Sequence, residues 1–152
     1  MSIVFTEKEK TLKFDIVGYQ FPDVSLLSNP NDDYDPNWLV VSINYSDVRL
    51  NVNEKDPCLL NYELKEITAS LDSILQGEET GFIGTFLEPY LSISVTQINE
   101  GYAVQIRYVY DNSDWSDIYV CQDMNWNELS EMNNELKRLY NMFPYRKIKE
   151  EK

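Results

Sequence analysis

Carboxylates are the side chains of this sequence most able to do chemistry, and many of them gather in two segments that also carry aromatic residues. NDDYDPNW (31–38) and YDNSDWSD (110–117) each hold three aspartates together with tyrosine and tryptophan. Such groups could bind a cation, act as a catalytic pair of carboxyls, or meet a basic protein. An ordinary acidic turn is the fourth interpretation, because aspartate is common in turns.

The first segment matches only the beginning of a calcium-binding EF-hand loop. Asp33, Asp35 and Asn37 occupy its first, third and fifth positions. The sixth position, which needs glycine, is Trp38, and the twelfth, which needs glutamate, is Asn44. We therefore expect no EF-hand and no metal or other cofactor, while a looser cation site among the acidic loops stays an open alternative.

The composition removes most catalytic arrangements. The chain has no histidine, which excludes the Ser-His-Asp and Cys-His arrangements and histidine-based zinc sites. The glycine-rich motifs GxxxxGK[ST] and GxGxxG, which cradle phosphates, are also missing. A carboxylate-dependent hydrolase stays as an alternative, but among 26 acidic residues some pair will satisfy almost any spacing. We expect no catalytic residues and a protein that is not an enzyme.

Negative charge is concentrated in the body of the chain. The whole sequence has a net charge of −13, and residues 14–136 hold 22 acidic residues against four basic ones, a net charge of −18. An acidic body repels nucleic acid and anionic membranes, and it attracts basic partners. The simpler alternative is that the acidity only maintains solubility.

The two acidic and aromatic segments are the best candidates for a protein-binding surface. Aromatic anchors dominate interface energetics, and acidic rims steer association. We expect Trp38 to lead the next strand into the core, whereas surface and core are equally open for Trp115. The predicted partner-binding residues are Asp32, Asp33, Tyr34, Asp35, Asp111, Asp114, Trp115 and Asp117.

Hydrophobic periodicity predicts the elements that must position these residues. Alternation of apolar and polar residues predicts strands, with a long loop over 22–37 and hairpins around residues 46–47 and 99–101. The predicted strands cover residues 11–21, 38–45, 48–53, 81–87, 90–98, 101–110 and 117–122. Two helices complete the pattern. We therefore expect an α+β domain, in which an antiparallel sheet of about six or seven strands packs against two helices.

Each predicted helix has its own start and stop signals. Asn61 is placed to cap the first helix, and Gly77 supplies a left-handed stop. Asn125 and Glu128 form a capping-box pattern for the second helix, which Pro144 ends. The apolar stripes are Leu60, Leu64, Ile67, Leu71 and Ile74 in the first helix, and Leu129, Met132, Leu136, Leu139 and Phe143 in the second.

The ends of the chain lie outside this pattern. We expect residues 1–10 to form a flexible N-terminal segment and 11–148 to form a single domain, with YRKIKEEK (145–152) as a solvated end.

Cys58 and Cys121 are expected to be buried free thiols. With no secretory signal and no long apolar run, we expect a cytoplasmic protein. The sequence does not indicate an oligomeric state.

Five stretches carry a family resemblance, and they occur in order along nearly the whole chain, over about residues 11–146. They are KFDIVGYQFP (13–22), DDYDPNWLVVSI (32–43), DPCLLNYELKEI (56–67), FLEPYLSI (86–93) and MNWNELSEMNNELKRLYNMFPYR (124–146). Together they resemble the WapI-type immunity proteins of Gram-positive bacteria.

The resemblance implies a cytoplasmic immunity protein that neutralises the toxin domain of a WapA-like, contact-dependent secreted toxin. The partner would be a nuclease-like toxin domain, which is expected to be basic, and no binding residue is transferred from the family. A regulatory module that binds a small ligand or another protein is the alternative function.

Overall fold

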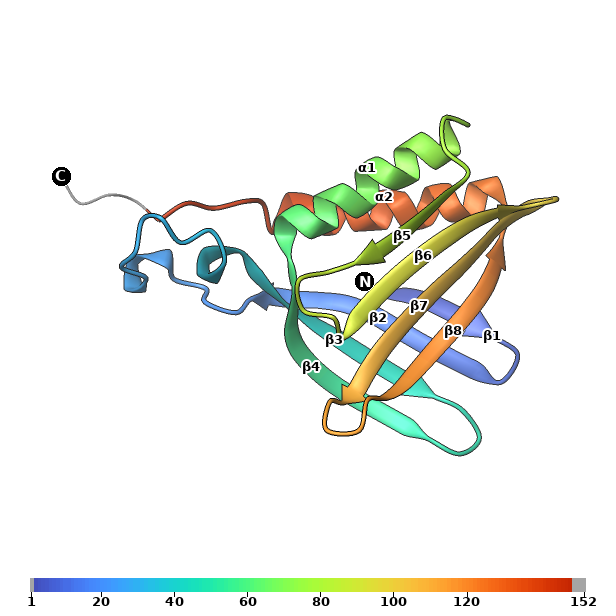
Figure 1. Cartoon of the computed structure of the whole chain (residues 1–152), viewed down its shortest axis with the longest axis horizontal. Coiled ribbons are helices and arrows are strands. Elements are labelled where there is room, and N and C mark those ends of the chain that lie inside the picture. Colours follow the sequence, from blue (N-terminus) through green and yellow to red (C-terminus); the bar gives the residue numbers. More distant parts are fainter. Residues whose placement is uncertain (1, 149–152) are drawn as a thin grey trace.

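A computed structural model, which describes residues 2–148, contains two antiparallel sheets of four strands and two helices (Figure 1). The first half of the chain forms β1 (Ile3–Glu7), β2 (Lys10–Tyr19), β3 (Trp38–Ser46), β4 (Asn51–Leu60) and α1 (Asn61–Leu75). The second half forms β5 (Gly81–Thr85), β6 (Leu91–Ile98), β7 (Gly101–Asp111), β8 (Ser116–Met124) and α2 (Trp126–Met142). The expected α+β class with antiparallel strands is confirmed, and its eight strands divide between two sheets.

Residues 3–7 form a strand, which differs from the flexible segment expected for residues 1–10, of which Met1 lies outside the described residues. Strand β1 pairs with β2 in an antiparallel register that sets Ile3 beside Phe14 and Phe5 beside Leu12. Ile3 and Phe5 are buried, and the residues between and after them are exposed or half-buried. This alternation is long enough to form a strand once β2 supplies hydrogen-bond partners, but it is too short to be recognised in isolation.

One hydrophobic core lies between the sheets and the helices. Strands of both sheets turn alternate side chains into it, such as Leu12 and Phe14 of β2 and Val104 and Ile106 of β7. The β1 edge of one sheet meets the β8 edge of the other, where the Thr6 N–H donates to Gln122 Oε1 at 2.9 Å. The two sheets are therefore layers of one domain.

The helices cover this core with the faces that the periodicity predicts. Leu64, Ile67, Leu71 and Ile74 of α1 are buried, as are Leu129, Met132, Leu136 and Leu139 of α2. The two helices also pack against each other above the sheets (Figure 1). In the described part of the chain, neither helix is long and apolar enough to cross a membrane.

The helix ends confirm three of the four predicted signals. Asn125 and Glu128 form the capping box of α2, Gly77 follows α1 with a φ of 78°, and Pro144 lies just beyond α2, which ends at Met142. The expected cap Asn61 is instead the first residue of α1, and Leu60 occupies the N-cap position. The Asn61 side chain is buried and donates to Asn37 Oδ1 at 2.9 Å. The beginning of α1 is capped by Glu63 instead, whose carboxylate accepts from the Leu60 N–H.

The Glu63 carboxylate ties the beginning of α1 to the second half of the chain. Its Oε1 accepts from the Leu60 N–H and its Oε2 accepts from the Leu87 N–H, both at 2.9 Å. Leu87 lies in the connection between β5 and β6. Burial raises the pKa of Glu63, against the lowering effect of the two hydrogen bonds. One buried side chain thus serves two backbone donors, one at the end of β4 and one in the β5–β6 connection.

Replacing Glu63 with alanine should lower the free energy of unfolding by about 2–4 kcal/mol, because the buried Leu60 N–H and the partly buried Leu87 N–H lose their acceptor. Chemical denaturation checks this. The exposed Glu66, on the same helix, is the matched control, and Glu66→Ala should change stability by less than about 0.5 kcal/mol. Equal stabilities of the two variants would contradict this structural function of Glu63.

Candidate functional site

The first acidic segment is held in shape by its own aspartates. Asp32 Oδ1 accepts from the backbone N–H groups of Tyr34 and Asp35, at 2.8 and 3.1 Å. Asp33 accepts a hydrogen bond from the Tyr145 hydroxyl at 2.5 Å. The pKa of Asp35 is raised by desolvation and then by the neighbouring Asp32. Tyr34 is exposed, so this segment still offers acidic and aromatic groups to a partner.

Trp38 does not enter the core, contrary to our expectation. Its side chain is half-buried and its ring lies against Tyr34, with 6.4 Å between the ring centroids. The next residue, Leu39, is fully buried and begins the inward-facing series of β3 with Val41 and Ile43. Because strand side chains alternate, the large aromatic ring falls on the opposite face.

The C-terminal segment 145–148 fastens the loop 20–37, which contains most of the first acidic segment. It is therefore not the solvated end that we expected. The Arg146 guanidinium donates to the carbonyl oxygens of Phe21, Pro22 and Pro36, at 2.6–3.0 Å. It also lies 3.4 Å above the centre of the Tyr19 ring. Burial lowers the pKa of Arg146. Residues 149–152 of the expected end lie outside the described residues.

The second acidic segment forms the turn between β7 and β8. Asp111 accepts from the N–H and hydroxyl of Ser113, and Asp114 accepts in the same way from Ser116. Both carboxylates therefore shape the turn, and the hydrogen bonds from Ser116 lower the pKa of Asp114. Asp117 is paired with Arg107, so its charge is locally compensated.

Trp115 is an exposed aromatic side chain at the tip of this turn. Its φ is 59°, in the left-handed region, and its side chain is 52 % exposed. The Trp115 ring lies beside Tyr90, with 5.9 Å between the centroids. The open question of surface or core is thereby answered in favour of the surface.

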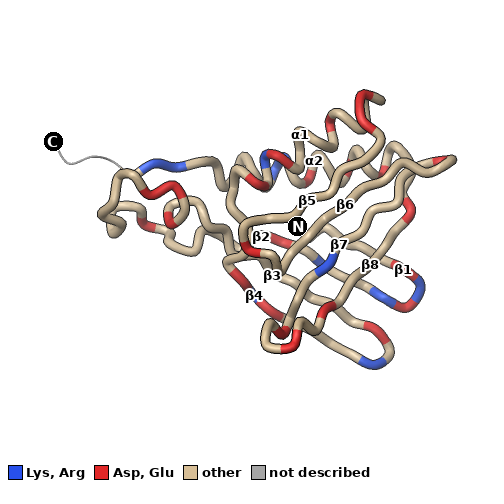
Figure 2. The backbone as a smooth tube through the Cα atoms, in the orientation of Figure 1, with Lys and Arg blue, Asp and Glu red and all other residues tan. Residues whose placement is uncertain are grey.

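The structure keeps the two acidic segments apart. The loop 20–37 lies beside the C-terminal segment, whereas the β7–β8 turn lies at the lower end of the second sheet, near β4 (Figure 1). The eight predicted partner-binding residues therefore form two separate groups. Figure 2 shows further acidic residues along β4, close to the β7–β8 turn.

An acidic hollow of about 160 Å³ lies at the seam where β4 of one sheet meets β7 of the other. The buried Tyr108 places its hydroxyl 2.9 Å from Glu54 Oε2 and 3.0 Å from Asp56 Oδ2. Its pKa is raised by burial and by the hydrogen bond to Glu54. One hydroxyl proton serves two carboxylates, which leaves the hollow rich in acceptors. The residues lining it are Glu54, Asp56, Tyr90, Tyr108, Val109, Tyr110, Asp111 and Asn112.

Glu54 and Asp56 are site residues that the sequence patterns missed. The strand predicted over 48–53 stops before them, whereas β4 continues to Leu60. They lie on the same alternating series as Val52 and Cys58, which are both buried. Two acids in an inward-facing series are unusual, because buried charges need partners. This signal could have indicated the hollow.

The geometry of the acidic hollow differs from that of a paired-carboxylate hydrolase. Such enzymes hold two carboxyls on either side of a cleft, with the substrate between them. Here Glu54 and Asp56 come from one strand and contact the same hydroxyl group. Within residues 2–148, no cluster of three or more His, Cys, Asp or Glu side chains could hold a metal ion. The arrangement is suited to accepting hydrogen bonds from a cationic group.

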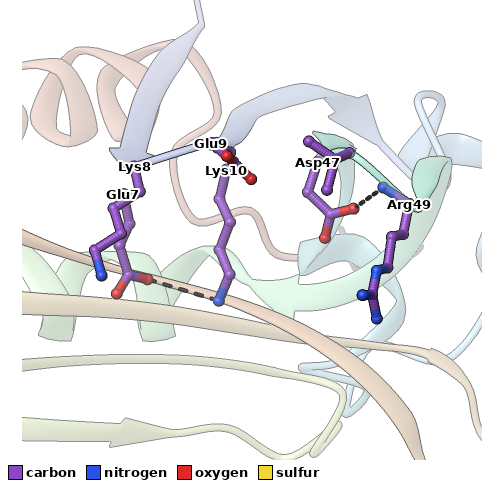
Figure 3. Close-up of a pocket in the computed structure, with 7 residues that line it drawn as sticks. Glu7, Lys8, Glu9, Lys10, Asp47 and Arg49 are labelled. Atoms are coloured by element: carbon purple, nitrogen blue, oxygen red, sulfur yellow. Dashed lines mark hydrogen bonds and ion pairs between the residues drawn. The ribbon is translucent and has the colours of Figure 1, made fainter.

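A second hollow, of about 430 Å³, lies between the tips of the β1–β2 and β3–β4 hairpins (Figure 3). Lys10 lies near Glu7 in it, at 3.7 Å, and Asp47 accepts from the backbone N–H of Arg49. Its acidic and basic side chains are equal in number, so it lacks the single sign of charge of the acidic hollow.

Together these features define a small α+β protein that presents acidic and aromatic surface at two separate places. A profile of the immunity protein WapI-like family matches residues 3–144. The chain therefore belongs to the WapI-like immunity protein family, and the match includes strand β1, which the resemblance left out.

Other comparisons add little to this assignment. No individually curated protein matches the chain significantly. Among solved structures, the crystal structure of WHY3 from Arabidopsis thaliana is similar with a TM-score of 0.44 and 8 % sequence identity. That alignment covers 94 % of this chain and 88 % of the other. At this TM-score the likeness supports no conclusion about function.

Replacing Arg146 with lysine should loosen the loop 21–37, because an ammonium group cannot donate to three carbonyl oxygens in the geometry of the planar guanidinium. We expect amide hydrogen exchange in residues 21–37 to become at least tenfold faster. Lys147→Ala, at an exposed neighbouring position, should leave exchange unchanged. Unchanged exchange in Arg146→Lys would show that the loop does not depend on this side chain.

Proposed function

We propose that this protein binds a basic toxin domain and neutralises it without catalysis, inside the cell that it protects. The family match over residues 3–144 is the observation that carries the proposal, because the family consists of immunity proteins. The toxin domain would be nuclease-like, since proteins that act on nucleic acid tend to be basic. The net charge of −18 in residues 14–136 complements such a partner.

The acidic hollow and the β7–β8 turn are the proposed centre of the binding surface. The hollow offers carboxylates to a lysine or arginine side chain, and Trp115 beside it offers an aromatic anchor. Its volume of about 160 Å³ is below the ~300 Å³ at which small-molecule sites begin. This size favours one inserted side chain over a small ligand.

The first segment, with Asp32, Asp33, Tyr34 and Asp35, is proposed as a second contact region. Its backbone is fixed by Arg146, so presenting these residues costs little ordering entropy. Part of its acidity is engaged internally, because Asp33 already accepts from Tyr145. We therefore give this region the smaller share of the interaction.

Co-expression tests the proposed function directly. The protein should restore growth to cells that express the toxin domain encoded beside its gene, and the two chains should elute as one complex. The complex should form more slowly as salt is raised, because the attraction is electrostatic. Continued cell death with no complex would reject the proposal.

Two sets of neutral substitutions, each removing three charges, should differ in their effect on association. Glu54→Gln, Asp56→Asn and Asp111→Asn together should slow association with the toxin domain at least tenfold at low salt. Asp32→Asn, Asp33→Asn and Asp35→Asn together should slow it at least twofold. The amides keep hydrogen-bond acceptors for Tyr108 and for the turns.

Stopped-flow measurements over a range of salt concentrations check this difference. The two sets change the net charge equally, so long-range attraction changes equally in both. Equal rates would therefore mean that only net charge counts and that the acidic hollow is not the centre of the interface.

A further inference from the structure

Strand β5 has an open edge, where its backbone groups face no other strand. It pairs with β6 on one side, and in the described part of the chain no strand pairs with its other side. By contrast, the edges formed by β1 and β8 meet each other through the Thr6–Gln122 and Glu7–Cys121 hydrogen bonds. The β5 edge is therefore a site where main-chain hydrogen bonds can be added.

The pairing pattern shows which residues face that open edge. The Gln97 N–H donates to the Thr80 carbonyl oxygen at 2.8 Å, which makes these two residues a hydrogen-bonded pair. In an antiparallel ladder, hydrogen-bonded and non-bonded pairs alternate. The backbone groups of 82 and 84 thus face β6, and those of Gly81, Ile83 and Thr85 face outward.

A groove of about 310 Å³ runs between this edge and helix α1. Small side chains of α1 form one wall, and Gly81 and Phe82 form part of the other. A strand added beside β5 would turn alternate side chains toward this groove, which is how extended segments gain specificity at sheet edges. The groove is lined by Ala69, Ser70, Ser73, Glu79, Gly81 and Phe82.

The charges around β5 indicate the chemistry of its partner. The stretch TGFIGTFL (80–87) contains no charged residue, and the Ile83 side chain is 79 % exposed. Glu78 and Glu79 precede this stretch and Glu88 follows it. An extended segment with an uncharged centre and lysine or arginine at both ends complements this pattern. A second copy of this chain, paired antiparallel, would bring the acidic ends together and is disfavoured.

We propose that the open edge of β5 binds an extended, basic-flanked segment of a protein partner as a fifth strand of the second sheet. The proposal builds on the proposed function, in which that partner is the toxin domain. It assigns to the partner a main-chain interaction in addition to the charge contacts at the acidic hollow. Side chains of the added strand would lie in the groove beside α1.

The variant Ile83→Pro tests the main-chain interaction selectively. Proline removes the outward-facing N–H of residue 83, while the hydrogen bonds between β5 and β6 are retained. The matched control Ile83→Thr shortens the same side chain and keeps the N–H. Circular dichroism and thermal unfolding of both variants establish that they are folded.

We expect Ile83→Pro to weaken the complex with the toxin domain at least tenfold, and Ile83→Thr to weaken it less than threefold. In the complex, amide hydrogen exchange of Ile83 and Thr85 should slow at least tenfold. The inference would be overturned if a folded Ile83→Pro variant had wild-type affinity and the Ile83 and Thr85 amides of the wild-type complex were unprotected. The immunity function would still stand.

A peptide probe keeps the inference testable if no toxin complex forms. The probe has five alternating valine and threonine residues with two lysines at each end, and its control has glutamates in place of the lysines. The lysine peptide should protect the amides of Ile83 and Thr85 in the wild-type protein, and it should not protect the Thr85 amide in Ile83→Pro, which has no amide at position 83. Protection by neither peptide, or equally by both, would overturn the inference. So would a wild-type homodimer that Ile83→Pro dissociates, because the occupant would then be a second copy.

Discussion

The sharing of one hydrophobic core by two sheets is the constraint on which the rest of this structure depends. Each sheet has one apolar face, and burial of that face is the main favourable term in folding. Strands β2 and β3 of the first sheet and β6 and β7 of the second contribute to the same core, which both helices cover. The two halves of the chain, each with four strands and a helix, therefore stabilise each other.

Polar connections across the seams between the halves accompany this shared core. Glu63 at the beginning of α1 accepts from Leu87 in the second half, and Tyr108 of β7 contacts Glu54 and Asp56 of β4. Burying carboxylates is costly unless they are hydrogen-bonded. Glu63 has an N–H group for each of its two oxygens, whereas Glu54 and Asp56 share one hydroxyl proton. A basic partner that donates to Glu54 and Asp56 would therefore supply the hydrogen bonds that these two carboxylates lack.

Apart from the Asp32–Asp35 region, the proposed binding surfaces occur where the fold leaves polar groups or an aromatic side chain without a full set of partners. The acidic hollow has more acceptors than donors, Trp115 projects from a turn, and β5 leaves backbone groups facing outward. Two of these contacts would be electrostatic or aromatic, and the third would come from the main chain. Such a combination joins fast, steered association with directional hydrogen bonds.

Local sequence patterns determined most of the secondary structure, apart from β1 and the second half of β4, and the general character of the surface. The spacing of Leu64, Ile67 and Leu71 was enough to place α1, and Asn125 with Glu128 was enough to start α2. Net charge and the absence of histidine pointed to binding rather than catalysis. These properties depend on neighbouring residues or on composition, so they can be recognised without knowing the fold.

Only the tertiary structure decided which distant residues meet. It divided the strands between two sheets and brought Glu54 and Asp56 to Tyr108. It placed Arg146 on the carbonyl oxygens of Phe21, Pro22 and Pro36. It also separated the two acidic segments that look alike in the sequence (Figure 2). The reason is physical: periodicity shows which face of an element is buried, whereas its partner is chosen by packing across the whole core.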